Sequence, residues 1–158
     1  MKTSKIVSLK NLSTILKTRF KNKTIVFTNG CFDILHYGHV HYLTQAKAKG
    51  DILIIGLNSD QSVRGLKGKN RPLNCEQDRA KVLAALACVD FVVIFNDSTP
   101  IRLIQTIKPS ILVKGGDWKK DKIVGRDIVL AGGGKVLTIP IVKNRSTSNI
   151  IKKILENC

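Results

Sequence analysis

Five short apolar runs recur along this chain, each followed by a segment with helical spacing, and this alternation is what most constrains the fold. The runs cover residues 24–29, 51–57, 90–95, 111–113 and 136–139. Their lack of polar alternation is typical of strands that are covered on both faces of a sheet. Strands that alternate with helices predict a parallel arrangement. We therefore expect a single α/β domain with a Rossmann-like, doubly wound, five-stranded parallel sheet and helices on both faces.

The segments between the runs carry helix signals. Ser8 stands at a capping position, Gly50 fits a helix C-terminus, and Pro100 fits a first turn. Helices are predicted over residues 8–21, 40–49, 75–88, 99–107, 123–130 and 147–155. The polar stretch 58–74 is predicted to be a long loop, and loops of such length inside a domain are usually functional or mobile.

The charge balance raises the question of nucleic-acid binding. The chain has 158 residues, and its 27 lysines and arginines against 11 acidic residues give a net charge of +16. These cations are spread along the chain, and five Phe, two Tyr and one Trp offer few side chains for base stacking. An enzyme that handles phosphates explains the charge as well, so we expect no nucleic-acid partner.

Neither a membrane segment nor a disulfide framework is visible in the sequence. No apolar run is long enough to span a bilayer, and residues 1–20 lack the apolar core of a signal peptide. The cysteines Cys31, Cys75, Cys88 and Cys158 show no framework spacing. We expect a cytoplasmic protein with free thiols and no membrane partner.

The stretch that carries chemistry is Thr-Asn-Gly-Cys-Phe-Asp-Ile-Leu-His-Tyr-Gly-His, residues 28–39. It lies between a predicted strand and a predicted helix, where backbone N–H groups and a helix N-terminus converge and favour an anion. His36 and His39 place imidazole groups beside the same anion. This arrangement predicts a nucleotide phosphate as the ligand.

The histidine pair also fits a metal site or a plain structural turn. A zinc site needs further Cys, Asp or Glu ligands at suitable spacing, and the cysteines form no Cys-x-x-Cys pair, so no metal site is predicted. The nucleotide interpretation is favoured because two more polar segments, 58–74 and 114–118, also follow predicted strands. The carboxyl ends of parallel strands share one edge of the sheet, which is where ligands bind.

Taken together, the motifs resemble those of the His-x-Gly-His nucleotidyltransferase superfamily and, within it, the ADP-heptose synthase family. The resemblance is carried by Thr28–Asp33, His36–His39, Gly56–Asp60, Ser62–Arg64, Leu66–Gly68, Arg71–Pro72, Asp78–Ala80, Val113–Asp117 and Ser146–Ser148. It implies a nucleotidyltransferase domain over residues 23–158, preceded by an N-terminal packing helix within residues 1–22. The reaction implied is transfer of AMP from ATP to D-glycero-β-D-manno-heptose 1-phosphate, giving ADP-heptose and pyrophosphate.

The resemblance also implies roles for individual residues. His36 and His39 are expected to donate to the α-phosphate and the bridging oxygen, with Lys47 as a further catalytic residue that approaches the phosphates. The residues implied to bind the nucleotide are Thr28, Asn29, Gly30, Cys31, Phe32, Gly38, Lys114, Gly116, Asp117, Ser146 and Thr147. Mg²⁺ is expected to bridge the triphosphate of ATP, although the sequence offers no carboxylate cage for it.

Basic residues after the second strand are candidates to neutralise the phosphate of the sugar acceptor. These candidates are Arg64, Lys67, Arg71 and Arg79. For the loop residues the alternative is a solvated surface charge, and for Arg79 it is a salt bridge to Glu76 or Asp78. Asp33 could cap a helix or orient an amide of the phosphate-binding loop, and the cap is favoured. Arg145 stands where an aromatic residue is common in the family. Its side chain could contact a phosphate or point to solvent.

Two other functions stay open on the sequence. Glycerol-3-phosphate cytidylyltransferases resemble the chain at the histidines, at Asp117-Trp118 and at Ser146-Thr147, but they typically have an arginine where this chain has Ile141 after Pro140. A non-catalytic basic module that binds nucleotides or nucleic acid predicts salt-sensitive affinity for polyanions and no pyrophosphate release. We expect small-molecule substrates as partners, and a homodimer is the oligomer that relatives often form.

Overall fold

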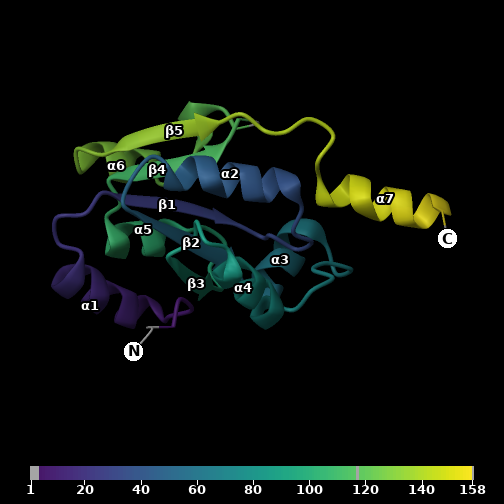
Figure 1. Ribbon diagram of the computed structural model, residues 1–158, viewed down its shortest axis with the longest axis horizontal. Helices are drawn as coiled ribbons and strands as arrows, with labels where there is room; N and C mark the ends of the chain where they lie inside the picture. The colour runs from purple at the N-terminus through teal and green to yellow at the C-terminus, as the bar shows by residue number, and fades with distance from the viewer. Residues whose placement is uncertain (1–3, 117, 158) are drawn as a thin grey trace.

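The computed structural model describes residues 4–116 and 118–157, and one parallel sheet organises them (Figure 1). Its strands are β1 (Ile25–Gly30), β2 (Ile52–Asn58), β3 (Phe91–Phe95), β4 (Ile111–Gly115) and β5 (Lys135–Ile139). Their order is β3-β2-β1-β4-β5, and all neighbouring strands are parallel. Strand β2 is buried along its whole length, as its unbroken apolar run predicts.

Helices cover both faces of this sheet. They are α1 (Leu9–Arg19), α2 (Tyr37–Lys47), α3 (Asp60–Lys67), α4 (Glu76–Ala85), α5 (Ile101–Ile107), α6 (Arg126–Ala131) and α7 (Thr147–Asn157), with a 3₁₀ turn η1 (Lys120–Lys122). One core forms around Phe27 with α1, α5 and α6, and the other forms around Val26 with α2 and α4. Successive strand residues point to opposite faces, so these two neighbours belong to different cores. The predicted doubly wound α/β fold is confirmed.

The strand order places a switch point between β1 and β4. From β1 the chain proceeds outward through β2 and β3, and it then returns to form β4 and β5 on the other side. The connections that leave β1 and β4 therefore diverge and open a crevice at the carboxyl ends of the strands. The stretch with the two histidines follows β1 directly, so the topology positions it at this crevice.

The predicted loop over residues 58–74 contains helix α3, and this is a correction to the sequence analysis. Ser59 caps the helix by accepting a hydrogen bond from the Ser62 N–H, and Gly68 ends it with a φ of +92°. The helix is short, and Val63 is its fully buried apolar residue. The Ser59 cap and the buried Val63 stabilise this helix, which has no stripe of apolar residues. A search for apolar residues at helical spacing therefore did not reveal it.

Helix α7 projects away from the sheet in Figure 1, and none of its residues is buried. Residues 140–146 lead to it from β5 along the carboxyl edge. Its N-terminus therefore lies at the crevice, while most of its length extends beyond the domain body.

Two further expectations can be compared with the described residues. Within them, no helix has both the length and the apolar character that crossing a membrane requires. The thiols of Cys31, Cys75 and Cys88 are free, and Cys158 lies outside the described residues.

Candidate active site

A cleft of about 640 Å³ lies at the carboxyl ends of the central strands. Its walls come from the β1–α2 loop (residues 31–36), the ends of β1 and β4, helix α3 and the start of α7. The predicted site residues that line it are Asn29, Gly30, Cys31, Phe32, His36, Gly38, His39, Lys67, Lys114, Ser146 and Thr147. The structure thus brings together side chains that are far apart in the sequence.

The two histidines lie against each other at the start of α2. Their ring centroids are 3.9 Å apart with the planes inclined by 22°, and the His39 ring meets the edge of Phe32 at 5.1 Å. A Cβ atom on Gly38 would lie 3.0 Å from the His36 ring and 3.1 Å from Cβ of Arg145. Glycine is therefore needed between the histidines for this close approach.

Both imidazoles are held in the neutral form. Burial, with smaller contributions from His36 and Lys67, lowers the pKa of His39 from 6.5 to about 4. Burial and the Arg145 guanidinium lower the pKa of His36 as well. The Nδ1 atoms of His36 and His39 are buried without a hydrogen-bond partner among the described residues. Buried polar atoms in proteins are nearly always paired, so the two unpaired Nδ1 atoms are unusual.

We expect His39 to titrate with a midpoint near pH 4 in the folded protein and near 6.5 after unfolding in urea, as followed by NMR of its ring protons. Because the unfolded chain binds this proton more tightly, stability should fall as the pH drops from 6.5 towards 4. A non-hydrolysable ATP analogue should raise the midpoint, since phosphate charges favour the imidazolium. A folded-state midpoint near 6.5 would contradict the burial argument.

Lys114 connects the ends of β1 and β4 across the switch point. Its ammonium donates to the Asn29 backbone oxygen at 3.2 Å and to Asn29 Oδ1 at 2.5 Å, and it lies 5.5 Å from the Trp118 ring centroid. The residue is only 8% exposed. A positive charge is therefore fixed at the floor of the cleft, where it favours an anionic ligand.

The start of α7 forms the opposite wall. Ser146 Oγ accepts a hydrogen bond from the Asn149 N–H, and Thr147 Oγ1 donates to the Ile34 carbonyl oxygen in the β1–α2 loop. The N-terminus of this helix and the Arg145 side chain both border the cleft. This wall offers N–H groups and positive potential to phosphates.

Two residues implied by the resemblance do not reach the cleft. Lys47 donates to Asp90 Oδ2 at 2.6 Å, and the same oxygen accepts the Leu53 N–H near the amino end of β2. Lys47 stands eight residues beyond His39, which is about 12 Å along the helix axis towards the other edge of the sheet. Thr28 is fully buried, with its hydroxyl 2.7 Å from the Tyr42 hydroxyl. A direct phosphate contact for Lys47 does not fit this geometry.

The arginine candidates for the acceptor also lie elsewhere. Arg64 is exposed and does not line the cleft. Arg71 donates from Nε to Asp33 at 2.7 Å and borders a separate groove of about 420 Å³ beside α7. The Arg79 side chain is fully buried and is paired with Asp60, rather than with Glu76 or Asp78. Of the four basic candidates, Lys67 is the one that lines the cleft.

Two more predicted nucleotide ligands need separate mention. Gly116 forms a turn in which its N–H donates to the Ile139 carbonyl oxygen at 2.7 Å, and a Cβ there would lie 3.2 Å from that oxygen. The glycine thus permits close approach of two backbones at the edge of the site. Asp117 lies outside the described residues.

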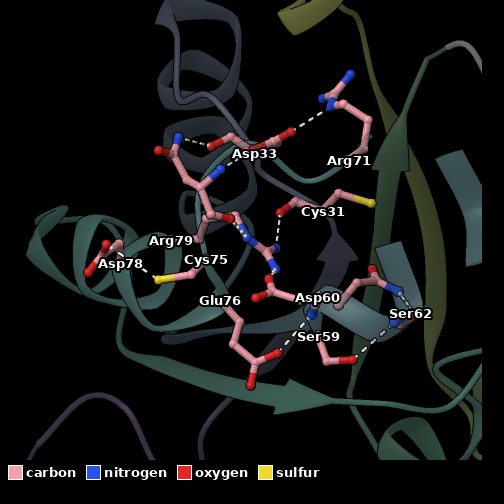
Figure 2. Close-up of polar contacts among 12 residues, drawn as sticks. Cys31, Asp33, Ser59, Asp60, Ser62, Arg71, Cys75, Glu76, Asp78 and Arg79 are labelled. Atoms are coloured by element: carbon pink, nitrogen blue, oxygen red, sulfur yellow. Dashed lines mark hydrogen bonds and ion pairs between the residues drawn. The ribbon is translucent and has the colours of Figure 1, made fainter. Parts of the chain in front are cut away.

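Asp33 has a role that the sequence analysis assigned wrongly. Its carboxylate does not cap α2; it accepts hydrogen bonds from the Leu73 and Asn74 N–H groups. It also accepts one from Arg71 (Figure 2). Burial opposes ionisation, but these donors and the Arg71 charge outweigh it and hold the Asp33 pKa below its ordinary value. Asp33 therefore ties the β1–α2 loop to residues 71–74.

The sequence analysis also missed polar residues at the end of β3. Ser98 and Thr99 line the cleft together with Asn58 at the end of β2. They follow buried strands, and residues that follow parallel strands meet at one edge of the sheet, so the reasoning that located the other polar loops would have found them. The omission came from applying the rule to three strands instead of four.

Comparisons with known proteins agree with this geometry. Residues 27–153 match the model of the cytidylyltransferase-like family. The bifunctional protein HldE of Geobacter metallireducens is 56% identical over 153 residues, which cover 96% of this chain and 31% of that protein. HldE of Campylobacter fetus subsp. fetus is 55% identical over 150 residues, which cover 95% of this chain and 31% of that protein. The chain thus spans about a third of the length of these relatives.

A solved structure shows the same similarity in three dimensions. The lipopolysaccharide core biosynthesis protein from Thermoplasma volcanium is 30% identical, with a TM-score of 0.65, over 78% of this chain and 100% of that one. The family match includes the histidine segment, the α3 region and most of α7, which are the parts that build the cleft. The chain belongs to the cytidylyltransferase-like family and is a nucleotidyltransferase.

Proposed function

We propose that the protein transfers AMP from ATP to D-glycero-β-D-manno-heptose 1-phosphate and releases pyrophosphate. The observation that carries the proposal is the stacked pair of imidazole rings in the cleft, which also holds Lys114 and the start of α7. The motif resemblance to ADP-heptose synthases and the similarity to HldE proteins support the choice of sugar. The similarity to a lipopolysaccharide core biosynthesis protein agrees with a product used for that polymer.

The chemistry requires positioning more than a protein nucleophile. An oxygen of the acceptor phosphate forms a bond to the α-phosphorus of ATP, and the bond from that phosphorus to the bridging oxygen breaks as pyrophosphate leaves. Charge builds on the non-bridging and bridging oxygens, so preorganised donors lower the barrier. His36 and His39 are placed to supply such donors, and no covalent intermediate on Cys31 is needed.

The two ends of the cleft suit the two phosphate-bearing substrates. Lys114 at the end of β4 and the α7 N-terminus, which contacts the β1–α2 loop, would hold the triphosphate and nucleoside of ATP. Lys67 and the polar residues Asn58, Ser98 and Thr99, on the β2 and β3 side, would meet the sugar phosphate. In this assignment the histidines stand between donor and acceptor, where transfer occurs.

ATP would enter as its Mg²⁺ complex. Among the residues that the structure describes, no group of three or more His, Cys, Asp or Glu is arranged to hold a metal ion. Triphosphate oxygens would therefore hold the ion, which neutralises charge on the departing pyrophosphate. The lysines and helix N-terminus of the cleft complement that charge. We propose that the reaction takes place in the cytoplasm, where ATP and sugar phosphates are available.

The test is pyrophosphate release with Mg²⁺ and heptose 1-phosphate, with ATP and CTP offered separately. We expect release with ATP. Release only with CTP, and faster with glycerol 3-phosphate, would assign the chain to cytidylyl transfer instead. A folded protein that binds ATP but releases no pyrophosphate with either nucleotide would refute adenylyl transfer to this acceptor, and salt-sensitive binding of polyanions would then favour a non-catalytic module.

A further inference from the structure

Arg79 is a charged side chain in the protein core that the proposed reaction does not use directly. It lies in the first half of α4, and its side chain has no exposed surface. A buried guanidinium is tolerated only where its charge and its donors are satisfied. Its partners therefore show what the residue is for.

Those partners come from three separate segments, as Figure 2 shows. Nη1 donates to the Cys31 carbonyl oxygen at 2.5 Å, Nε donates to the Asn74 carbonyl oxygen at 2.9 Å, and Nη2 donates to Asp60 Oδ1 at 2.7 Å. Asp60 begins α3 and supplies the counter-charge. The guanidinium thus joins the β1–α2 loop to α3 and to the segment before α4.

The contact with Cys31 acts on a peptide unit at the cleft. In a planar trans peptide the carbonyl oxygen of Cys31 and the N–H of Phe32 point in opposite directions. A guanidinium that holds this oxygen therefore also fixes the direction of that N–H, which lies in the same plane on the opposite side of the C–N bond. Cys31 and Phe32 both line the cleft, next to His39.

The backbone at this point needs such support. Phe32 has a φ of +44°, in the left-handed region that residues with a side chain rarely adopt. Strained conformations of this kind persist only where the surroundings determine them. Arg79 holds the peptide immediately before the strained residue, while the Phe32 ring packs against His39 on the other side.

We propose that Arg79 is a positioning residue that holds the β1–α2 loop in the conformation that receives the α-phosphate. It acts through the Cys31 carbonyl and does not touch the substrate. This role rests on the proposed nucleotidyl transfer for its effect on catalysis, but its effect on the loop is independent of any substrate. The forked guanidinium is essential because a lysine ammonium cannot span the three acceptors.

The experiment compares Arg79→Lys with Leu83→Val on the same helix. Leu83 is 1% exposed, packs in the core and does not line the cleft, so its variant reports on general loosening of α4. In Arg79→Lys we expect kcat for pyrophosphate release to fall about 100-fold, the scale of a small misplacement of reacting groups, with a smaller change in KM for ATP. Backbone ¹⁵N order parameters at Cys31 and Phe32 should fall from about 0.85 to below about 0.6 without substrate.

A second variant tests the same contact by chemical rescue. Arg79→Ala leaves a cavity of guanidinium shape beside Asp60, and guanidinium ion at millimolar, non-denaturing concentration should restore at least about a tenth of the lost rate by refilling it. The same ion should not restore activity to a protein that lacks His39. If Arg79→Ala does not fold, Arg79→Lys still decides the matter.

The outcomes are separable from those of the proposed function. Unchanged order parameters in Arg79→Lys, or an equal loss of kcat in Leu83→Val, would overturn the positioning role. If the wild-type protein releases no pyrophosphate at all, the proposed function fails. The order parameters then still support or overturn the link between Arg79 and the loop.

Discussion

Replacing His39 with alanine should lower kcat at least about 100-fold and leave the protein folded, because it removes one donor that acts in the transition state. The ring borders the cleft and is not part of either core, so its loss leaves the sheet and its helices in place. Steady-state pyrophosphate release with ATP measures the rate, and circular dichroism with a urea titration confirms the fold. KM for ATP should change much less than kcat.

His41→Ala is the matched control for this experiment. His41 lies on the same helix two residues further on, does not line the cleft, and has its ring near Tyr37. Its variant should retain wild-type turnover within about twofold, since it touches none of the groups that contact phosphate. Near-normal turnover in a folded His39→Ala protein would remove the proposed mechanism.

The second large effect concerns stability. Asp33→Asn should lower the free energy of unfolding at pH 7 by about 3 kcal/mol, because it leaves Arg71 without its buried counter-charge. The side chains of Asp33 and Arg71 are 1% and 16% exposed, so water cannot replace the lost interaction. The amide also offers one acceptor oxygen where the carboxylate offers two to Arg71 and to the Leu73 and Asn74 N–H groups. Urea unfolding measures the change.

The pH dependence of that difference checks its cause. The pKa of Asp33 is lowered in the folded protein, so its stabilising effect is present above the unfolded-state value of 3.8 and is lost as the pH falls through the lower folded value. The difference in the free energy of unfolding between wild type and Asp33→Asn should therefore become smaller below about pH 4. The effect of His39 protonation is common to both proteins and cancels in the comparison.

Asp127→Asn provides the control for a carboxylate that is paired but exposed. Its side chain is 91% exposed and pairs with the neighbouring Arg126. Surface ion pairs contribute little to stability, so Asp127→Asn should change the free energy of unfolding by less than about 0.5 kcal/mol. An Asp33→Asn variant no less stable than this control would show that Asp33 does not hold residues 71–74.

The fold and the location of the site follow from local patterns in the chain. Apolar runs long enough for one strand each, separated by helical periodicity, leave few arrangements other than a parallel sheet covered on both faces. Once the strands are parallel, residues that follow them must meet at one edge. The structure places His36, Gly38 and His39 at the cleft on this edge, because they follow a strand directly and start a helix.

Sequence analysis could not decide which of several basic residues would face the cleft. Lys47, Lys67, Arg71 and Arg79 all carry a charge suited to phosphate, yet only Lys67 of these four lines the cleft. Helix length carries Lys47 to the opposite edge of the sheet, where it pairs with Asp90. The position of Lys47 could have been predicted from the sequence, because the rise per residue of an α-helix is constant.

Arg79 and Asp33 are different, because their roles depend on partners brought together only by folding. Arg79 meets Cys31, Asn74 and Asp60, and Asp33 meets residues about 40 positions away. Periodicity and spacing describe neighbours along one element and carry no information about which distant carbonyl or carboxylate a long side chain will reach. The sequence by itself determined the sheet, the edge that carries the cleft and the histidine pair at that edge. Tertiary packing decided which charges face the cleft and which hold the loops that surround it.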